Sequence, residues 1–342
     1  MWRAEQRGLT SGKCVASVLW PRDLGGWSRV LLDGQKLMMN MAQAAGLGVL
    51  QGVSELFPIS SLAQTILIPA LLKWDLGARE QSNFLAFVVA LHLATAIALL
   101  IYFWSDWKRV FAAYVGSIKR GKLVYDADSK FAWLLVAGTI VVGLLGVVFE
   151  KKLRQLFENP KYYWIIGLVL VVNGFIMMFA DVVKRRMSIK ENPQHTDPGS
   201  DPALDAPQER KTAEQMTFIE GVSIGATQSF ALIPGISRSG VTIVTALFAG
   251  LSYEEASRFS FMLATYAIGG AAILKVPSLF KPENRHVLML AIPSSILAGI
   301  TAYLSTRYLM RYFRHNRLTP FGWYCIVFGA FAAVILKMHG PG

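Results

Sequence analysis

The chain has 342 residues, of which 54% are hydrophobic and only 16% are charged. Soluble domains carry about 25% charged residues, so this composition, with its positive mean hydropathy, indicates an integral membrane protein. The net charge of +12 would suit nucleic-acid binding in a soluble protein. Because the cations lie between apolar segments, as in membrane proteins, we expect no nucleic-acid partner. The two cysteines, Cys14 and Cys325, match neither a metal nor a disulfide spacing.

The chain begins with a basic segment, residues 1–41, which we interpret as an N-terminal extension. Its first 37 residues lack the continuous apolar stretch of a signal peptide. Beyond it, two apolar segments, about 42–72 and 217–250, are interrupted by proline, glycine and serine. Each is interpreted as a helix, a non-helical turn and a second helix. Such broken segments survive in a membrane only where protein or a water-filled cavity satisfies the exposed backbone.

Six further segments approach the length of about 20 residues that crosses the hydrocarbon of a bilayer. They are residues 82–104, 131–149, 162–180, 259–274, 287–304 and 319–338. Three spans follow each broken segment. If each broken hairpin returns to the side from which it entered, an odd number of spans carries the chain across, so the second half would start on the opposite face of the membrane. The predicted fold class is all-α integral membrane with an inverted-topology repeat, each half a broken re-entrant helical hairpin plus three transmembrane helices.

The predicted boundaries place the first membrane repeat at 42–182 and the second at 217–338. Between them, residues 183–216 are rich in proline and charge, which predicts a flexible cytoplasmic linker. Lysine and arginine are more numerous on the side that carries this linker, so we assign that side to the cytoplasm. The hairpin around Glu55 would then enter from outside, with both termini outside.

Two polar motifs lie within the broken segments and resemble each other, at residues 51–61 (QGVSELFPISS) and 228–240 (QSFALIPGISRSG). Glu55 and Arg238 are ionisable groups in sequence that is otherwise apolar. Burying such charges costs several kcal/mol unless they are paired or face a wet cavity. Both residues are therefore candidates for function.

In the second motif, proline and glycine end one helix, and Ser237, Arg238 and Ser239 open the next. A helix N-terminus offers free N–H groups and a positive dipole to an anion. An arginine adds a planar fork that can bind phosphate oxygens in pairs, and serine hydroxyls add neutral donors. These three residues predict a phosphate or diphosphate cradle. The alternative is that Arg238 pairs with Glu55 to hold the two halves together, and the two roles can coexist.

The first motif carries what a hydrolase needs. Glu55 can ligate a hard divalent cation or act as a general base, and the Ser61 hydroxyl can bind phosphate or attack phosphorus. Gln51 lies four residues before Glu55 and therefore on the same helix face. The alternative is structural: serines that cap the second helix, and a Gln51 amide that bonds a freed carbonyl. We favour the cap for Ser60 and function for Ser61.

Other polar residues lie within apolar spans. A lone histidine, His92, is interpreted as hydrogen-bonded packing more readily than as a ligand. Asn173, Gln228 and Tyr266 are predicted to make hydrogen bonds between helices.

Residues 51–61 together with 232–242 resemble the bacterial undecaprenyl-diphosphate phosphatase family, which is linked to bacitracin resistance. The resemblance extends over about residues 42–338. It implies an enzyme of the bacterial plasma membrane with an outward-facing site and a divalent cation, Mg²⁺ or Ca²⁺. Such an enzyme removes the terminal phosphate of the C55 isoprenyl diphosphate and so regenerates the monophosphate carrier lipid for peptidoglycan and other envelope polymers.

The resemblance also implies roles for single residues. It assigns catalysis to Glu55, Ser61 and Arg238, with Glu55 as the metal ligand. Beside Ser237, Arg238 and Ser239, we predict Gln51 and Gln64 as further residues that bind the diphosphate. Gln64 departs from the family, which usually has histidine at this position, because glutamine forms hydrogen bonds but does not titrate.

The predicted function is therefore hydrolysis of undecaprenyl diphosphate by a membrane-bound phosphatase. Gln64 keeps an alternative open, namely a polyprenyl-phosphate transporter or flippase, or a catalytically weakened binder of the lipid diphosphate, on the same fold. The predicted partners are the diphosphate lipid and membrane lipids. A homodimer is left open.

Overall fold

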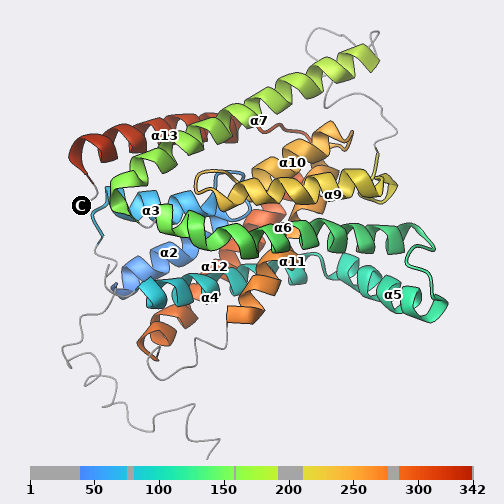
Figure 1. Ribbon diagram of the computed structural model, residues 1–342, viewed down its shortest axis with the longest axis horizontal. Helices are drawn as coiled ribbons and strands as arrows, with labels where there is room; N and C mark the ends of the chain where they lie inside the picture. Colours follow the sequence, from blue (N-terminus) through green and yellow to red (C-terminus); the bar gives the residue numbers. More distant parts are fainter. Residues whose placement is uncertain (1–38, 75–80, 158, 192–210, 276–284, 341–342) are drawn as a thin grey trace, which may run out of the picture. The chain divides into compact units, whose positions relative to one another are not determined.

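The computed structural model describes residues 39–74, 81–157, 159–191, 211–275 and 285–340, and they are helical almost throughout (Figure 1). The helices are α2 (Met41–Ser54), α3 (Ser61–Leu71), α4 (Gln81–Tyr102), α5 (Trp104–Arg120), α6 (Ala127–Phe157), α7 (Tyr163–Glu191), α9 (Phe218–Thr227), α10 (Arg238–Phe248), α11 (Tyr253–Lys275), α12 (Arg285–Tyr312) and α13 (Thr319–His339). Short 3₁₀ turns, η1 (Pro160–Tyr162), η2 (Ala213–Gln215) and η3 (Gln228–Leu232), connect some of them. The all-α prediction is confirmed for this part of the chain.

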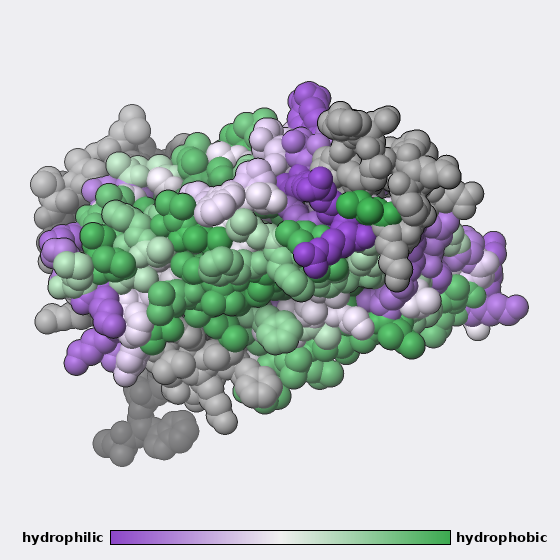
Figure 2. Space-filling view, turned by 90° about the horizontal axis from the view of Figure 1, so that it is seen from above, coloured by the Kyte–Doolittle hydropathy of each residue, from purple (hydrophilic) through white to green (hydrophobic). Residues whose placement is uncertain are grey.

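Each of the six predicted spans lies on a helix, namely α4, α6, α7, α11, α12 and α13. Within the described residues, α6, α7, α12 and α13 contain stretches long and apolar enough to cross a membrane, and α4 with α5 forms a further bent pair. Apolar side chains cover much of the surface seen in Figure 2, and hydrophilic ones gather toward its two ends. The chain is a multi-pass membrane protein.

Both predicted breaks are present. The first separates α2 from α3 around Pro58, and the second separates η3 from α10 at Pro234 and Gly235. Gly235 has a φ of 110°, which glycine adopts without steric cost. Ser60 occupies the N-cap position of α3, as favoured from the sequence, but with a φ of 64° it makes no capping hydrogen bond through its side chain.

Residues 105–130, which lie between the first two predicted spans, contain a helix, α5, which bends by 86° from α4. The charged residues of this helix kept its sequence from being predicted as a membrane span. The helix buries Trp107 and Val110 on one face and leaves Phe111 and Ile118 exposed on another. Helix α7 likewise continues to Glu191, past the start of the predicted linker. The end of the predicted linker, residues 211–216, includes η2. Its remaining residues, 192–210, and the N-terminal extension up to residue 38 lie outside the described residues.

Helix α2, which leads into the first break, packs closely against α12. At Gly52 the two backbones approach so far that a Cβ atom would collide with Thr301 and the Ala298 carbonyl and would lie 2.9 Å from the Ala302 nitrogen. Interiors are packed too tightly to absorb such an atom without a backbone shift. Glycine at position 52 therefore allows α2 to pack this close to α12.

The substitution Gly52→Ala is expected to destabilise the protein by about 1–3 kcal/mol, because it overpacks this contact. Gly143→Ala on α6 is the matched control, since a Cβ there meets no atom within 4 Å and alanine favours a helix by about 1 kcal/mol over glycine. Thermal unfolding in detergent should show a lowered Tm for the first variant only. Equal Tm values would contradict the close approach.

Candidate active site

The two motifs meet at the carboxylate of Glu55, which follows the last residue of α2. The Arg238 guanidinium, on the first residue of α10, donates from Nη2 to Glu55 Oε1 at 2.6 Å. The other carboxylate oxygen, Oε2, accepts from Ser61 Oγ at 2.6 Å and from Gln51 Nε2 at 2.9 Å. The structure thus brings together four of the side chains singled out in the sequence. Gln51 bonds the carboxylate rather than a freed carbonyl.

A fifth side chain reaches the same carboxylate from α4. His92 Nε2 lies 3.4 Å from Glu55 Oε2, and its Nδ1 lies 2.8 Å from the Val88 carbonyl oxygen. Because a carbonyl can only accept, Nδ1 must carry the proton of that bond. The sequence interpretation of His92 as packing missed this contact. The signal available was an ionisable residue within an apolar span, but nothing in the sequence joins it to Glu55.

Two polar atoms of this cluster are buried and have no protein partner among the described residues. They are Arg238 Nη1 and Gln51 Oε1. The side chains of Glu55 and Arg238 are only 5% and 15% exposed. An unpaired donor on a buried cation is costly, and buried groups left in this way need an explanation, such as a ligand. The cluster therefore has both a donor and an acceptor free for one.

The serines beside Arg238 are bonded within the protein. The Ser237 hydroxyl accepts from the Gly240 N–H at 3.1 Å and so caps α10. It also lies 3.1 Å from Ser239 Oγ, which donates to the Phe57 carbonyl at 3.3 Å. These hydroxyls lie next to the cluster, but they now stabilise the turn.

Three consecutive carbonyl groups of the first break each receive a side-chain donor. Phe57 bonds Ser239, Pro58 bonds Asn173 at 3.2 Å, and Ile59 bonds Gln64 Nε2 at 2.9 Å. A broken membrane helix needs such partners because lipid offers none. The side chains that serve this turn come from α10, α7 and α3.

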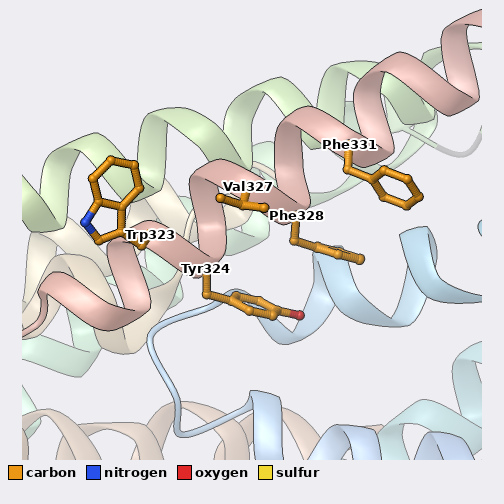
Figure 3. Close-up of a pocket in the computed structure, with 5 residues that line it drawn as sticks. All are labelled: Trp323, Tyr324, Val327, Phe328 and Phe331. Carbon is orange, nitrogen blue, oxygen red and sulfur yellow. The ribbon is translucent and has the colours of Figure 1, made fainter.

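Gln64, predicted as a ligand of the diphosphate, has protein partners at both ends of its amide. Besides the bond to Ile59, its Oε1 accepts from the Tyr324 hydroxyl of α13 at 3.0 Å. Tyr324 lines a shallow apolar groove, in which it lies beside three more aromatic residues and a valine (Figure 3). The groove is lined by Trp323, Tyr324, Val327, Phe328 and Phe331.

The residues predicted as interhelical hydrogen-bonding groups divide into two kinds. Asn173 contacts both breaks, and Tyr266 of α11 shares a 2.7 Å hydrogen bond with Tyr114 of α5. Within the described part of the chain, Gln228 bonds only the Gly225 carbonyl of the preceding helix, at 3.4 Å.

Comparison with known proteins places this chain in a family. The family described as bacitracin resistance protein BacA matches residues 44–331, which include both breaks and every residue of the cluster. The chain belongs to this family.

This chain covers nearly the whole length of the relatives that follow. A protein of Mycolicibacterium paratuberculosis named undecaprenyl-diphosphatase is 41% identical over 314 residues, which is 88% of this chain and 99% of the relative. One from Frankia alni, named undecaprenyl-diphosphatase 2, is 38% identical over 85% of this chain and 96% of its own. One from Granulibacter bethesdensis, named undecaprenyl-diphosphatase, is 40% identical over 85% and 95%.

Proposed function

We propose that this protein is an undecaprenyl-diphosphatase, which hydrolyses the C55 isoprenyl diphosphate to the monophosphate and phosphate. One observation carries the proposal: the buried Arg238 guanidinium has a nitrogen without a partner among the described residues, beside a carboxylate bonded to a serine hydroxyl. A guanidinium binds phosphate oxygens in pairs, and a hydroxyl that is hydrogen-bonded to a carboxylate is an activated nucleophile. The names of the relatives indicate the same chemistry.

In this reaction Ser61 Oγ attacks the terminal phosphorus, and Glu55 takes the hydroxyl proton. The bond from that phosphorus to the bridging oxygen breaks, and the lipid monophosphate leaves with the proton from Glu55. Water then attacks the phosphoserine, giving one proton to Glu55, which returns it to Ser61 as phosphate departs. The 2.6 Å bond between Ser61 and Glu55 supports these roles. His92 Nε2 lies 3.4 Å from the same carboxylate oxygen, Glu55 Oε2.

Arg238 stabilises the charge that develops on the transferred phosphoryl group, and electrostatic stabilisation is the main rate term in such transfers. Its Nη2 is bonded to Glu55, and this bond weakens the carboxylate as a base. A diphosphate that binds the guanidinium draws it away from Glu55. Substrate binding thereby frees the base at the moment when it is needed.

A divalent cation, Mg²⁺ or Ca²⁺, belongs to the same proposal. Glu55 and the unpaired Gln51 Oε1 are hard oxygen donors, which suit such an ion. No group of three or more His, Cys, Asp or Glu side chains gathers for a metal in the described part of the chain. The donor set therefore fits an ion that takes its remaining ligands from water and substrate phosphates, as Mg²⁺ commonly does. When bound, it neutralises phosphate charge.

The lipid tail leaves the cluster along α3 and lies in the aromatic groove of α13. Gln64 supports this route, because it lies one helical turn after Ser61 and bonds Tyr324 of the groove. The groove is apolar throughout its lining (Figure 3), as an isoprenyl chain requires.

The site faces outward in an inverted repeat. The pairing of helices supports the repeat: α6 packs on α9 as α12 packs on α2, while α4 pairs with α11 and α7 with α13. Each contact is thus reproduced when the halves are exchanged. The basic residues at both ends of α5 support the orientation, since they suit the cytoplasmic face.

The test is phosphate release from the C55 diphosphate by purified protein in detergent. We expect turnover with Mg²⁺, loss of turnover when a chelator removes divalent cations, and recovery when Mg²⁺ is added back. Turnover untouched by chelation would remove the cation from the proposal. Lipid binding without phosphate release would contradict the phosphatase and favour the transporter, which needs no pair like Ser61 and Glu55.

A further inference from the structure

Each break leaves a backbone group without a helical partner, and one side chain serves both. Asn173 Oδ1 accepts from the Ser237 N–H of the second break at 2.9 Å. Its Nδ2 donates to the Pro58 carbonyl of the first break at 3.2 Å. The side chain is fully buried. No other side chain in the described residues has hydrogen bonds to the backbone of both breaks.

Asn173 belongs to a rigid support that carries none of the reacting groups. Its helix, α7, lies beside α13 (Figure 1), and glycines let the two backbones approach closely. A Cβ atom on Gly174 would lie 2.6 Å from the Gly322 carbonyl oxygen, and one on Gly167 the same distance from that of Gly329. Because such contacts allow little sliding, the amide of Asn173 has a fixed place.

We propose that Asn173 is a positioning residue that holds the two hairpins in register, so that Ser61 and Arg238 face the same phosphate. Ser61 lies three residues after Pro58 and Arg238 follows Ser237 directly, so each bond of the amide fixes the turn next to one reacting side chain. This role rests on the proposed phosphatase. We call these two hydrogen bonds of Asn173 the clamp. The clamp concerns only the relative position of the two hairpins, so it is measurable without turnover.

The clamp matters because the Arg238–Glu55 bond cannot serve in its place. That bond joins two of the side chains that engage the diphosphate, whereas the bonds of Asn173 go to backbone groups of the two breaks. A weaker contact supplements them: Cys325 Sγ lies 3.8 Å from the Pro58 carbonyl and 3.5 Å from Asn173 Nδ2. Thiols are weak donors, so asparagine supplies the main constraint.

The test compares Asn173→Leu, which keeps the size of the side chain and loses both bonds, with Cys325→Ala, which removes only the thiol. For Asn173→Leu we expect kcat to fall about 100-fold, the effect of misplacing reacting groups by about 1 Å, with a much smaller change in KM. Cys325→Ala should stay within a few-fold of the parent. A structural role alone would lower the amount of folded protein and leave kcat per folded molecule unchanged.

A spectroscopic measurement tests the clamp directly. With Cys14 and Cys325 replaced by alanine, cysteines at Leu62 and Phe230, which are 42% and 58% exposed, carry spin labels on the two hairpins. The distance distribution should be narrow with Asn173 and broad in Asn173→Leu. An unchanged distribution or an unchanged kcat would overturn the proposal. A broadened distribution in a protein that releases no phosphate would support the clamp and overturn the phosphatase instead.

Discussion

The substitution Arg238→Lys should lower kcat for phosphate release by about 10²–10³-fold, the usual effect of removing one donor from a charge-stabilising site. Lysine keeps the positive charge but loses the planar fork, so it cannot supply the second nitrogen that Arg238 leaves unpaired in the cluster. Steady-state kinetics with the C55 diphosphate in detergent measures the effect.

Arg109→Lys is the matched control for this experiment. Its side chain is 52% exposed on α5, where it pairs with Asp106, and surface ion pairs contribute at most about 1 kcal/mol. Its rate should equal that of the parent protein. If Arg238→Lys also kept its rate within a few-fold, charge alone would suffice, and the paired contact to phosphate would be wrong.

Ser61→Ala and Glu55→Gln should each lower kcat by at least about 10³-fold, and the double variant should be hardly worse than either. Groups that act as one unit give such non-additive losses, because removing one already disables the other. The 2.6 Å bond between them is the reason to expect a unit here. Phosphate release and trapping of a phosphoserine in acid-quenched reactions are the two readouts.

The nearby Ser54→Ala is the control, since the Ser54 hydroxyl donates to the Leu50 carbonyl of its own helix. It should retain most of the activity. Losses that multiply in the double variant would show that Ser61 and Glu55 act independently. Ser61→Ala with nearly full activity would assign the attack to water held by Glu55.

The sequence predicts the fold well where single residues decide the backbone. Proline disfavours a helix interior, and Pro58 and Pro234 lie at the two breaks, although Pro69 and Pro293 lie within α3 and α12. Long apolar segments mark the spans. The sequence-based prediction fails at α5, where the apolar residues recur at a helical spacing but the charged residues resemble those of a loop. Such a helix is recognised only by its buried face, which includes Trp107 and Val110.

The candidate site is predictable in part for the same reason. Glu55 and Arg238 stand out because a charge in an apolar segment demands a partner. Contacts across the fold leave no such mark: His92 reaches Glu55 only through the packing of α4, and the link from Asn173 to both breaks depends on α7. Gln64, which we predicted as a ligand of the diphosphate, is bonded to Ile59 and Tyr324 in the structure, and the sequence does not show these contacts.

The bond between Glu55 and Arg238 joins residues 183 positions apart in the chain, and this separation constrains how the protein is made. The ribosome delivers the α2 hairpin to the membrane long before α10 exists. Until then Glu55 has its partners from the first half, Gln51, Ser61 and His92, but lacks the Arg238 guanidinium, and a carboxylate without a cation is costly in hydrocarbon unless it is protonated. The first hairpin reaches its final charge pairing only when the second hairpin joins it. A nascent first half thus holds no assembled active site, and carrier lipids are safe from it until synthesis is nearly complete.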